Sequence, residues 1–426
     1  MTNPQTEFID VARLRIGHYV FIDVNWISHP FPLNSFKIHS DEQIGIIRSL
    51  GIDRIRYSPQ RSDPDPVPAV IPARGDTAPV GATPPGPAAA ADALRREALA
   101  EQRSSLRKCE RLFGNASRSF RQVVESAHAR PALAGQAAYA LVREMTDDLG
   151  GEHDLYIRLL SEDAGEGASM HAINVTVISL LLARACGLDE SELSDVGIGA
   201  LLHDVGKIHL PDRLRYHNEH LTVAEQQIFQ DHVRYGVEIG NKMRLSKAAL
   251  LVIGQHHESA DGSGYPAGID NERASPAARI VSLVNHYDNL CNPNNPALAL
   301  TPYEAIAHIF VQRKHCFDGT TLGLFVRMMG VYPPGSVVEL SDRRYALVVS
   351  VNASRPLKPR VIVHDPAIPR DDALILDLAH EPALGIRRSL RPLQLPKAAI
   401  DYLSPRQRIC YFFERGRSAG ETRGEA

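Results

Sequence analysis

The sequence predicts a multidomain chain built around a central all-α domain, with a small α+β module before it and a small β-rich appendage after it. Apolar residues recur at helical spacing from about residue 92 to residue 330. A stretch rich in proline and alanine precedes that region, and short strand-like runs follow it. We therefore expect an N-terminal module over 1–60, a linker over 61–91, a helical domain over 92–330 and an appendage over 331–426.

The composition is that of a globular protein without a strong charge. Its 426 residues include 47 Lys and Arg against 50 Asp and Glu, a net charge of −3, unlike the basic surface of a protein that coats nucleic acid. The five cysteines form no Cys-x-x-Cys pair, which indicates free thiols in a reducing compartment. No apolar run is long enough to span a bilayer, and the N-terminus lacks the pattern of a secretory signal. We expect a cytoplasmic protein.

The N-terminal module combines strand and helix signals. Residues 19–24 and 53–57 are rich in β-branched and aromatic side chains, and residues 40–43 have the spacing of a helix capping box. Three residues form either a binding face or ordinary core and turn positions: Trp26, His29 and Phe31.

Turn signals divide the rest of the chain into elements. Nearly every window from 92 to 329 has helical spacing; examples of the expected helices span 94–112, 120–128, 134–149, 170–186, 192–203, 224–243 and 277–290. The expected strands of the appendage span 337–340, 346–351, 360–364 and 374–376. The charged segment 94–108 is either the first helix of the bundle or a signalling or dimerising helix.

Histidine and carboxylate residues recur along the helical domain. The candidates are His171, His203, Asp204, His232, His256, His257, Asn285 and Asp288. Taken singly, a helical histidine is usually a surface residue or a satisfied core residue. The adjacent pair His203–Asp204 is different, because apolar runs flank it and an unpaired carboxylate there would be costly. Imidazole and carboxylate ligands suit Zn, Mn, Fe or Ni, and a bridging Asp suits two ions.

A loop with two glycines, Asp261–Pro266, follows the histidine doublet by four residues. Its glycines allow a tight turn with exposed backbone N–H groups, Tyr265 offers an aromatic face, and Pro266 stiffens the exit. Beside a metal site such a loop is suited to holding a phosphodiester and stacking a base. Alone it is an ordinary Gly/Pro turn.

These motifs, in this order, resemble the HD-GYP family of bacterial cyclic-di-GMP phosphodiesterases, which are HD-superfamily metallohydrolases. They are His203-Asp204-Val205-Gly206-Lys207, His232, His256-His257-Glu258 and Asp261-Gly262-Ser263-Gly264-Tyr265-Pro266. The resemblance covers about residues 145–329. The N-terminal module and the appendage resemble those of the subgroup in which a small domain of unknown function precedes the HD-GYP domain.

The resemblance implies a role for each matching residue. The implied metal ligands are His171, His203, Asp204 as the bridge, His232, His256 and His257, with Asn285 at the position of the last ligand. Lys207 matches the lysine that holds the scissile phosphate. The implied contacts to the nucleotide are Gly264, Tyr265 and Pro266, together with Asp288 near the substrate. Asp204, Lys207 and Asp288 are thus the catalytic candidates.

Two positions depart from the family pattern. Asn285 replaces an aspartate ligand, and its neutral amide is a weaker ligand than a carboxylate. Gly167 stands four residues before His171, where some family members carry a glutamate that serves a third metal. We therefore expect two ions rather than three.

The resemblance implies hydrolysis of cyclic-di-GMP to the linear dinucleotide, with further cleavage to GMP left open, in second-messenger signalling. The implied cofactors are two divalent transition-metal ions, such as Fe or Mn. Two alternatives remain: a receptor that binds cyclic-di-GMP without turnover, and a phosphohydrolase acting on another nucleotide or an alarmone. A homodimer or a signalling protein partner is compatible with the helical domain, whereas a nucleic-acid polymer or a membrane span is not expected.

Overall fold

The computed structural model describes residues 7–21, 35–38, 41–48, 52, 54–62, 87–149, 155–161, 167–215, 221–352 and 355–415. The chain divides into two compact units, 1–84 and 85–426. The candidates Trp26, His29 and Phe31 lie outside the described residues, as do Ser40 of the expected capping box and most of the expected linker.

Within its described residues, the first unit contains a four-stranded antiparallel sheet and one short α-helix. The strand order is β1 (Glu7–Asp10), β4 (Arg54–Ser58), β2 (Tyr19–Phe21) and β3 (Ser35–Lys37). The helix is α1 (Asp41–Arg48), and the described 3-10 turns are η1 (Val11–Arg13) and η3 (Pro59–Arg61). Val20 and Ile55 from the sheet and Ile47 from the helix are buried together, which confirms the expected α+β character.

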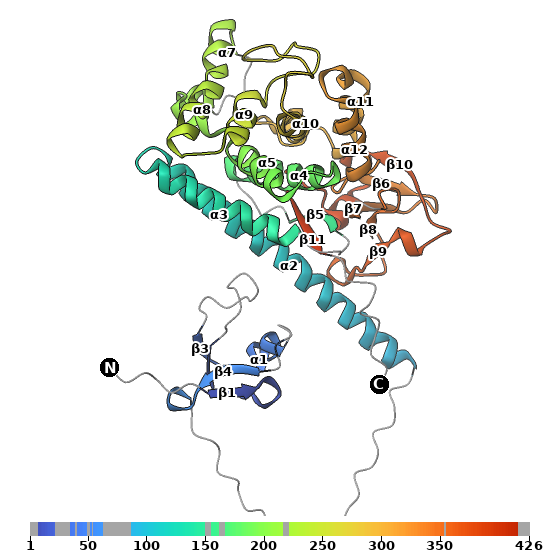
Figure 1. The fold of residues 1–426 in the computed structure, drawn as a ribbon. Helices are drawn as coiled ribbons and strands as arrows, with labels where there is room; N and C mark the ends of the chain where they lie inside the picture. The colour runs from blue at the N-terminus through green and yellow to red at the C-terminus, as the bar shows by residue number, and fades with distance from the viewer. Residues whose placement is uncertain are drawn as a thin grey trace, which may run out of the picture. The chain divides into compact units, whose positions relative to one another are not determined.

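The second unit is mostly helical (Figure 1). Its α-helices are α2 (Pro87–Ala127), α3 (Pro131–Leu149), α4 (Gly167–Ala185), α5 (Glu190–Leu202), α6 (Asp212–Arg215), α7 (Val223–Gln230), α8 (His232–Lys242), α9 (Lys247–Gln255), α10 (Pro276–Cys291), α11 (Pro302–Gln312), α12 (Gly319–Met329) and α13 (Lys397–Leu403). Its 3-10 turns include η5 (Val205–His209), η6 (Pro296–Leu298) and η7 (Lys314–Cys316). Helix α4 is apolar on nearly every side and lies at the centre of the bundle, where almost all of it is buried.

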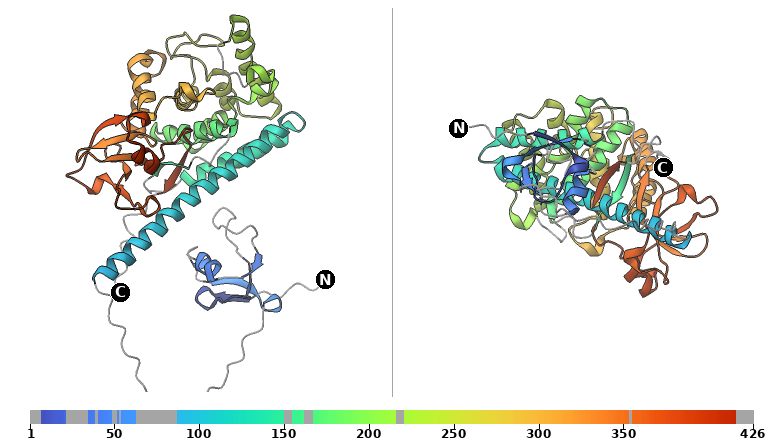
Figure 2. Two further views of the ribbon diagram at one scale, coloured as in Figure 1. Left: turned by 180° about the vertical axis from the view of Figure 1, so that it is seen from behind. Right: turned by 90° about the horizontal axis from the view of Figure 1, so that it is seen from below.

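Two helices differ from their predicted bounds. Helix α2 runs without a break where two helices were expected, and its 41 residues make it about 60 Å long. It packs against α3 (Figure 1) and is seen from behind in the left view of Figure 2, and this packing outweighs the weak helix propensity of Gly114. The helix expected over 224–243 is interrupted at Asp231, which separates α7 from α8.

The C-terminal strands form a seven-stranded antiparallel sheet with a strand from the helical region. The order along the sheet is β10 (Ile386–Leu390), β6 (Val337–Leu340), β7 (Tyr345–Asn352), β5 (Leu155–Leu159) and β11 (Tyr411–Arg415). Two further strands extend from β7: β8 (Arg360–Val363) and β9 (Ile375–Asp377). Strand β5, which the sequence pattern does not predict, pairs with both β7 and β11. The C-terminal segment therefore shares a core with the helices.

The predicted fold class is confirmed: a helical centre, an α+β N-terminal unit and a β-rich C-terminal part. Among the described helices, none combines the length and the apolar character that a membrane crossing requires.

Candidate functional site

The His203–Asp204 pair lies where helix α5 ends and turn η5 begins. Residues 196–202 of α5 are buried, so the helix delivers His203 into the interior as its C-cap. Gly206 then allows η5 to approach helix α8 closely, because a Cβ atom there would clash with the carbonyl oxygen of His232 and the amide nitrogen of Gly236. This close approach places His232 beside Asp204.

The structure brings six of the predicted metal ligands into two groups that share Asp204. One group is His171, His203 and Asp204, and the other is Asp204, His232, His256 and His257. Within each group the potential ligand atoms all lie within 4.8 Å of one another. The residues come from helix α4, the end of α5, the start of α8 and the end of α9, so that tertiary packing assembles the groups.

The two oxygens of Asp204 face different histidines. Its Oδ1 lies 3.5 Å from His232 Nε2 and 3.8 Å from His256 Nε2. Its Oδ2 lies 3.5 Å from His203 Nε2 and 3.8 Å from His171 Nε2. A carboxylate oriented in this way is suited to bridging two cations.

Hydrogen bonds to acceptor-only groups fix the tautomer of four histidines. Each Nδ1 faces an oxygen: His171 faces Asp288 (2.6 Å), His203 faces the Ala200 carbonyl (2.7 Å), His232 that of Phe229 (2.6 Å) and His256 that of Ile253 (2.8 Å). Nδ1 must therefore donate, and each neutral ring directs the lone pair of Nε2 into the site.

These lone pairs face one another. His171 Nε2 lies 3.2 Å from His203 Nε2, and His232 Nε2 lies 3.4 Å from His256 Nε2. Two facing acceptors repel unless a cation or a proton lies between them. Among the described residues, Asp204 Oδ1 and His257 Nε2 are also buried without a hydrogen-bond partner. The donor set therefore fits divalent transition-metal ions.

The protonation states favour metal binding. Burial lowers the pKa of His203 to about 4 and lowers the pKa of His232. Burial also holds the pKa of His256 and of His257 well below its usual value. Burial alone would raise the pKa of Asp204, but Lys207 and the histidines outweigh it and hold that pKa well below its usual range. The site thus offers neutral imidazoles and an ionised carboxylate.

We expect the free energy of unfolding of the metal-free protein to fall as the pH falls from about 6.5 to about 4. In this range the unfolded chain binds a proton at His203 that the folded chain excludes, so acid favours unfolding. Denaturant titrations at several pH values measure the slope of the free energy of unfolding against pH. It should be shallower in His203→Gln and unchanged in His380→Gln, whose side chain is exposed. A flat profile in the unsubstituted protein would contradict this account.

Lys207 lies at the edge of the site. Its Nζ donates a hydrogen bond to Asp204 Oδ2 at 2.6 Å and lies 5.3 Å from the centre of the Phe229 ring. The side chain is 28% exposed, so the ammonium group is accessible from outside while it remains attached to the site.

The loop Asp261–Pro266 packs against the histidine doublet. The ring of Tyr265 stacks on His257, with the ring centres 4.5 Å apart, so one face of the tyrosine is already covered. Gly264 is required for this approach, because a Cβ atom there would clash with backbone atoms of His257 and Glu258. Burial raises the pKa of Tyr265, which keeps its hydroxyl neutral.

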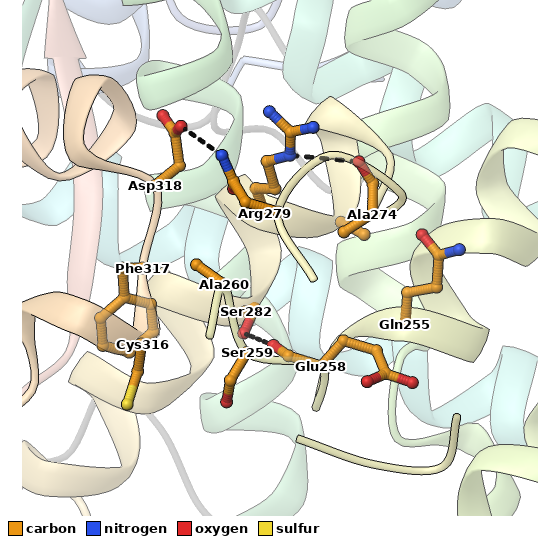
Figure 3. Close-up of a pocket in the computed structure, with 12 residues that line it drawn as sticks. Gln255, Glu258, Ser259, Ala260, Ala274, Arg279, Ser282, Cys316, Phe317 and Asp318 are labelled. Carbon is orange, nitrogen blue, oxygen red and sulfur yellow. Dashed lines mark hydrogen bonds between the residues drawn. The ribbon is translucent and has the colours of Figure 1, made fainter. Parts of the chain in front are cut away.

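The side chain of Glu258, for which the sequence analysis offers no role, holds this loop. It is buried, and its two oxygens accept hydrogen bonds from the backbone N–H groups of Ala267 (2.7 Å) and Ile269 (3.0 Å). Ser282 in turn donates to the Glu258 carbonyl at 3.1 Å (Figure 3). The only sequence signal for this role is an acidic residue directly after the histidine doublet.

Asp288, which the resemblance implies near the substrate, lies beside His171. Its side chain is fully buried, and Oδ2 accepts the hydrogen bond from His171 Nδ1. Oδ1 accepts from Asn174 (2.8 Å) and Asn292 (3.0 Å), so that both oxygens are used. This geometry shows that Asp288 orients the ring of His171, and a contact between Asp288 and the substrate stays a prediction.

The two asparagines join Asp288 to the C-terminal strand. Asn174 donates to the Ile409 carbonyl (2.7 Å) and accepts from the Tyr411 N–H (2.9 Å). Asn292 accepts from the Ile409 N–H (2.8 Å). The segment that begins β11 therefore helps to orient His171, a function that carries no recognisable sequence signal.

Replacing Asp288 by asparagine is expected to weaken metal binding about 10- to 100-fold. An amide cannot accept from three donors, so one buried N–H group loses its partner at a cost of about 1–3 kcal/mol in folding free energy. Metal titration and thermal denaturation measure the two effects. Asp401→Asn, at an exposed position of α13, is the control, and unchanged metal affinity in Asp288→Asn would contradict the positioning role.

The two departures from the family pattern are visible in the structure. Asn285 is buried on α10, and its amide oxygen accepts a hydrogen bond at 2.8 Å from Asn289, one helical turn later. Gly167 begins α4 and has no side chain to offer as a ligand.

Comparison with known proteins identifies two families along the chain. Residues 154–321 match the HD domain, and residues 7–138 match the domain of unknown function DUF3391. The chain is 28% identical to the cyclic di-GMP phosphodiesterase PA4108 of Pseudomonas aeruginosa, over 83% of this chain and 84% of that protein. It is 32% identical to the cyclic di-GMP phosphodiesterase response regulator RpfG of Xanthomonas campestris, over 38% of this chain and 43% of that protein.

Among solved structures, Bd1817, an HDG"Y"P protein from Bdellovibrio bacteriovorus, aligns with 75% of this chain and 97% of its own length. That alignment has a TM-score of 0.40 and 16% identity. The two matched domains and the ordered ligand motifs agree with the resemblance described above, including the domain of unknown function at the N-terminus. The chain thus carries a DUF3391 domain followed by an HD domain, which is the domain order that the resemblance to the HD-GYP family implies.

Proposed function

We propose that this protein is a metal-dependent phosphodiesterase that hydrolyses cyclic-di-GMP to the linear dinucleotide in second-messenger signalling. The proposal rests on the two clusters of histidines that share Asp204. Their Nε2 lone pairs are directed into the site. The relatives PA4108 and RpfG, both named cyclic di-GMP phosphodiesterases, support the choice of substrate.

Two divalent ions, Fe or Mn, are the proposed cofactors. His171 and His203 would hold one ion, while His232, His256 and His257 would hold the other, with Asp204 between them. When bound, such ions supply Lewis acidity and an activated water for attack on phosphorus. Asn285 is the proposed additional ligand, because its oxygen retains a second lone pair besides the one that accepts from Asn289.

The chain's own residues have separable tasks in this proposal. Lys207 neutralises negative charge that develops on the phosphoryl oxygens, because its ammonium group lies at the rim of the site. Asp288 retains the proton on His171 Nδ1 and so keeps Nε2 available as a ligand. Glu258 holds the loop that places Gly264, Tyr265 and Pro266 beside the centre.

We further propose that the protein acts in the cytoplasm, as a homodimer or with a signalling protein partner. All five cysteines are free, which suits a reducing compartment. The long helix α2 begins the second unit and is the proposed dimerising or signalling element. Sedimentation of the full chain tests the dimer, and a single monomeric species would exclude it.

Asn285 favours one alternative, a receptor that binds the cyclic dinucleotide without cleaving it. A neutral amide already hydrogen-bonded to Asn289 is a weaker ligand than a carboxylate. The six other proposed ligands and Lys207 favour catalysis, so we expect turnover. Tight binding of cyclic-di-GMP without product by the metal-loaded protein would establish the receptor instead.

A substrate panel tests the proposed function. The protein is purified without oxygen, loaded with Mn or Fe, and incubated separately with cyclic-di-GMP, 3′3′-cGAMP, cyclic-di-AMP and an alarmone. We expect cyclic-di-GMP to be consumed fastest, with the linear dinucleotide as the first product. Preferential cleavage of another nucleotide would overturn the proposed substrate while retaining the metal-dependent hydrolase.

A further inference from the structure

A separate group of metal-ligand side chains lies at the start of the Asp261–Pro266 loop. Asp261 Oδ2 lies 3.7 Å from His315 Nε2 and 3.8 Å from Cys316 Sγ. The three potential ligand atoms all lie within 4.8 Å of one another. None of these residues belongs to the two groups that share Asp204.

The distances between these ligand atoms suit an ion with tetrahedral coordination. With Zn–S near 2.3 Å and Zn–O and Zn–N near 2.0 Å, the tetrahedral edges are about 3.5 Å for S···O and about 3.3 Å for N···O. The observed separations exceed these edges by a few tenths of an ångström, which side-chain rotation can close. A thiolate, an imidazole and a carboxylate form a zinc-type ligand set and leave the fourth position to water.

The local structure orients two of the three ligands. Asp261 Oδ1 accepts hydrogen bonds from the Ser263 N–H (3.0 Å) and the Ser263 hydroxyl (2.6 Å), which leaves Oδ2 directed at Cys316 and His315. The Ala260 N–H donates to the Cys316 carbonyl at 2.8 Å and ties the loop to turn η7. The group is thus held from both sides by contacts that do not involve its ligand atoms.

The burial and the charge of these three side chains also suit a bound cation. Cys316 is buried beside Phe317 at the edge of a pocket (Figure 3), whereas the His315 side chain is 60% exposed and gives an ion access from solvent. Burial raises the pKa of the Cys316 thiol, the Arg313 guanidinium lowers it, and Asp261 raises it. A divalent ion adds a stronger positive charge at the same place, and the carboxylate and the thiolate together neutralise it.

We propose that Asp261, His315 and Cys316 bind one zinc-type divalent ion, separate from the centre around Asp204. A bond forms between sulfur and the ion, and the thiol proton passes to solvent. Because Asp261 begins the loop that carries Tyr265, the ion fastens that loop to η7. The site stands whether or not the protein cleaves cyclic-di-GMP.

Cobalt titration under anaerobic conditions tests this site without any activity measurement. Among the described residues, the Asp204 groups contain only nitrogen and oxygen donors, so a near-ultraviolet thiolate-to-cobalt charge-transfer band reports on Cys316 alone. We expect the full chain to develop this band and zinc to abolish it. Cys316→Ser should remove the band and lower the bound metal by one ion per chain, while Cys186→Ser should change neither.

His315→Ala is a second variant that separates loss of the site from a folding defect, because this exposed side chain can be removed without disturbing the core. It should lower the cobalt affinity of the thiolate site at least tenfold and leave the other ions bound. No charge-transfer band in the unsubstituted protein, or a band that persists in Cys316→Ser, would overturn the proposal.

Discussion

Asp204→Asn is expected to release both ions of the proposed centre and to lower cyclic-di-GMP turnover by about 1,000-fold or more. Both oxygens of Asp204 face histidine nitrogens, two on each side, so the substitution weakens both halves of the site at once. An amide offers one oxygen instead of two and carries no charge to balance two cations. The measurements are metal content after desalting and product formation by chromatography.

Asp231→Asn is the matched control for this substitution. Asp231 lies directly before His232, but its side chain is 44% exposed and pairs with Arg234 rather than with the site. Metal content and turnover should therefore match those of the unsubstituted protein. Full turnover in Asp204→Asn would show that the shared carboxylate is not part of the chemistry.

Lys207→Met is expected to lower turnover about 100- to 1,000-fold while the ions remain bound. In the structure the ammonium group lies 2.6 Å from Asp204 Oδ2 and competes with a cation for that oxygen. Removing it should leave metal affinity unchanged or higher, the opposite of the Asp204→Asn result. Parallel metal titration and kinetics distinguish the two effects.

The control for Lys207→Met is Lys242→Met, at an exposed position near the end of α8. It should change neither quantity. Loss of metal in parallel with loss of turnover in Lys207→Met would show that the lysine supports the site's structure instead of the phosphoryl group.

The six residues of the two groups around Asp204 could be named from the sequence because their motifs resemble those of a known family, even though they come from four helices. The residues that orient these side chains through hydrogen bonds could not be predicted. Asn174 and Asn292 are ordinary amides in sequence, and their role depends on residues 409–411, more than 100 positions away in the chain. The contact between Asp288 and His171 could not be predicted for the same reason. Sequence spacing places Asp288 one helical turn from Asn285 but does not reveal that its carboxylate faces His171.

The fold was predictable where periodicity is strong and local. Helix α4 and strands β6 to β8 lie within a few residues of their expected bounds. Strand β5 could not be recognised, since five residues between helices give no clear period and its partners β7 and β11 are distant in sequence. Helix α2 was expected as two helices, over 94–112 and 120–128, because its packing against α3 and β11 is not visible in sequence.

The most direct test of the central claim compares cyclic-di-GMP hydrolysis by the metal-loaded protein with that of its Asn285→Asp variant. Both are purified without oxygen, loaded with Mn or Fe, and followed by chromatography together with their metal content. We predict that the unsubstituted protein forms the linear dinucleotide with two ions at the Asp204 centre, and that Asn285→Asp binds metal more tightly. Binding of cyclic-di-GMP without turnover by the unsubstituted protein, with hydrolysis only in Asn285→Asp, would contradict the claim and identify a receptor.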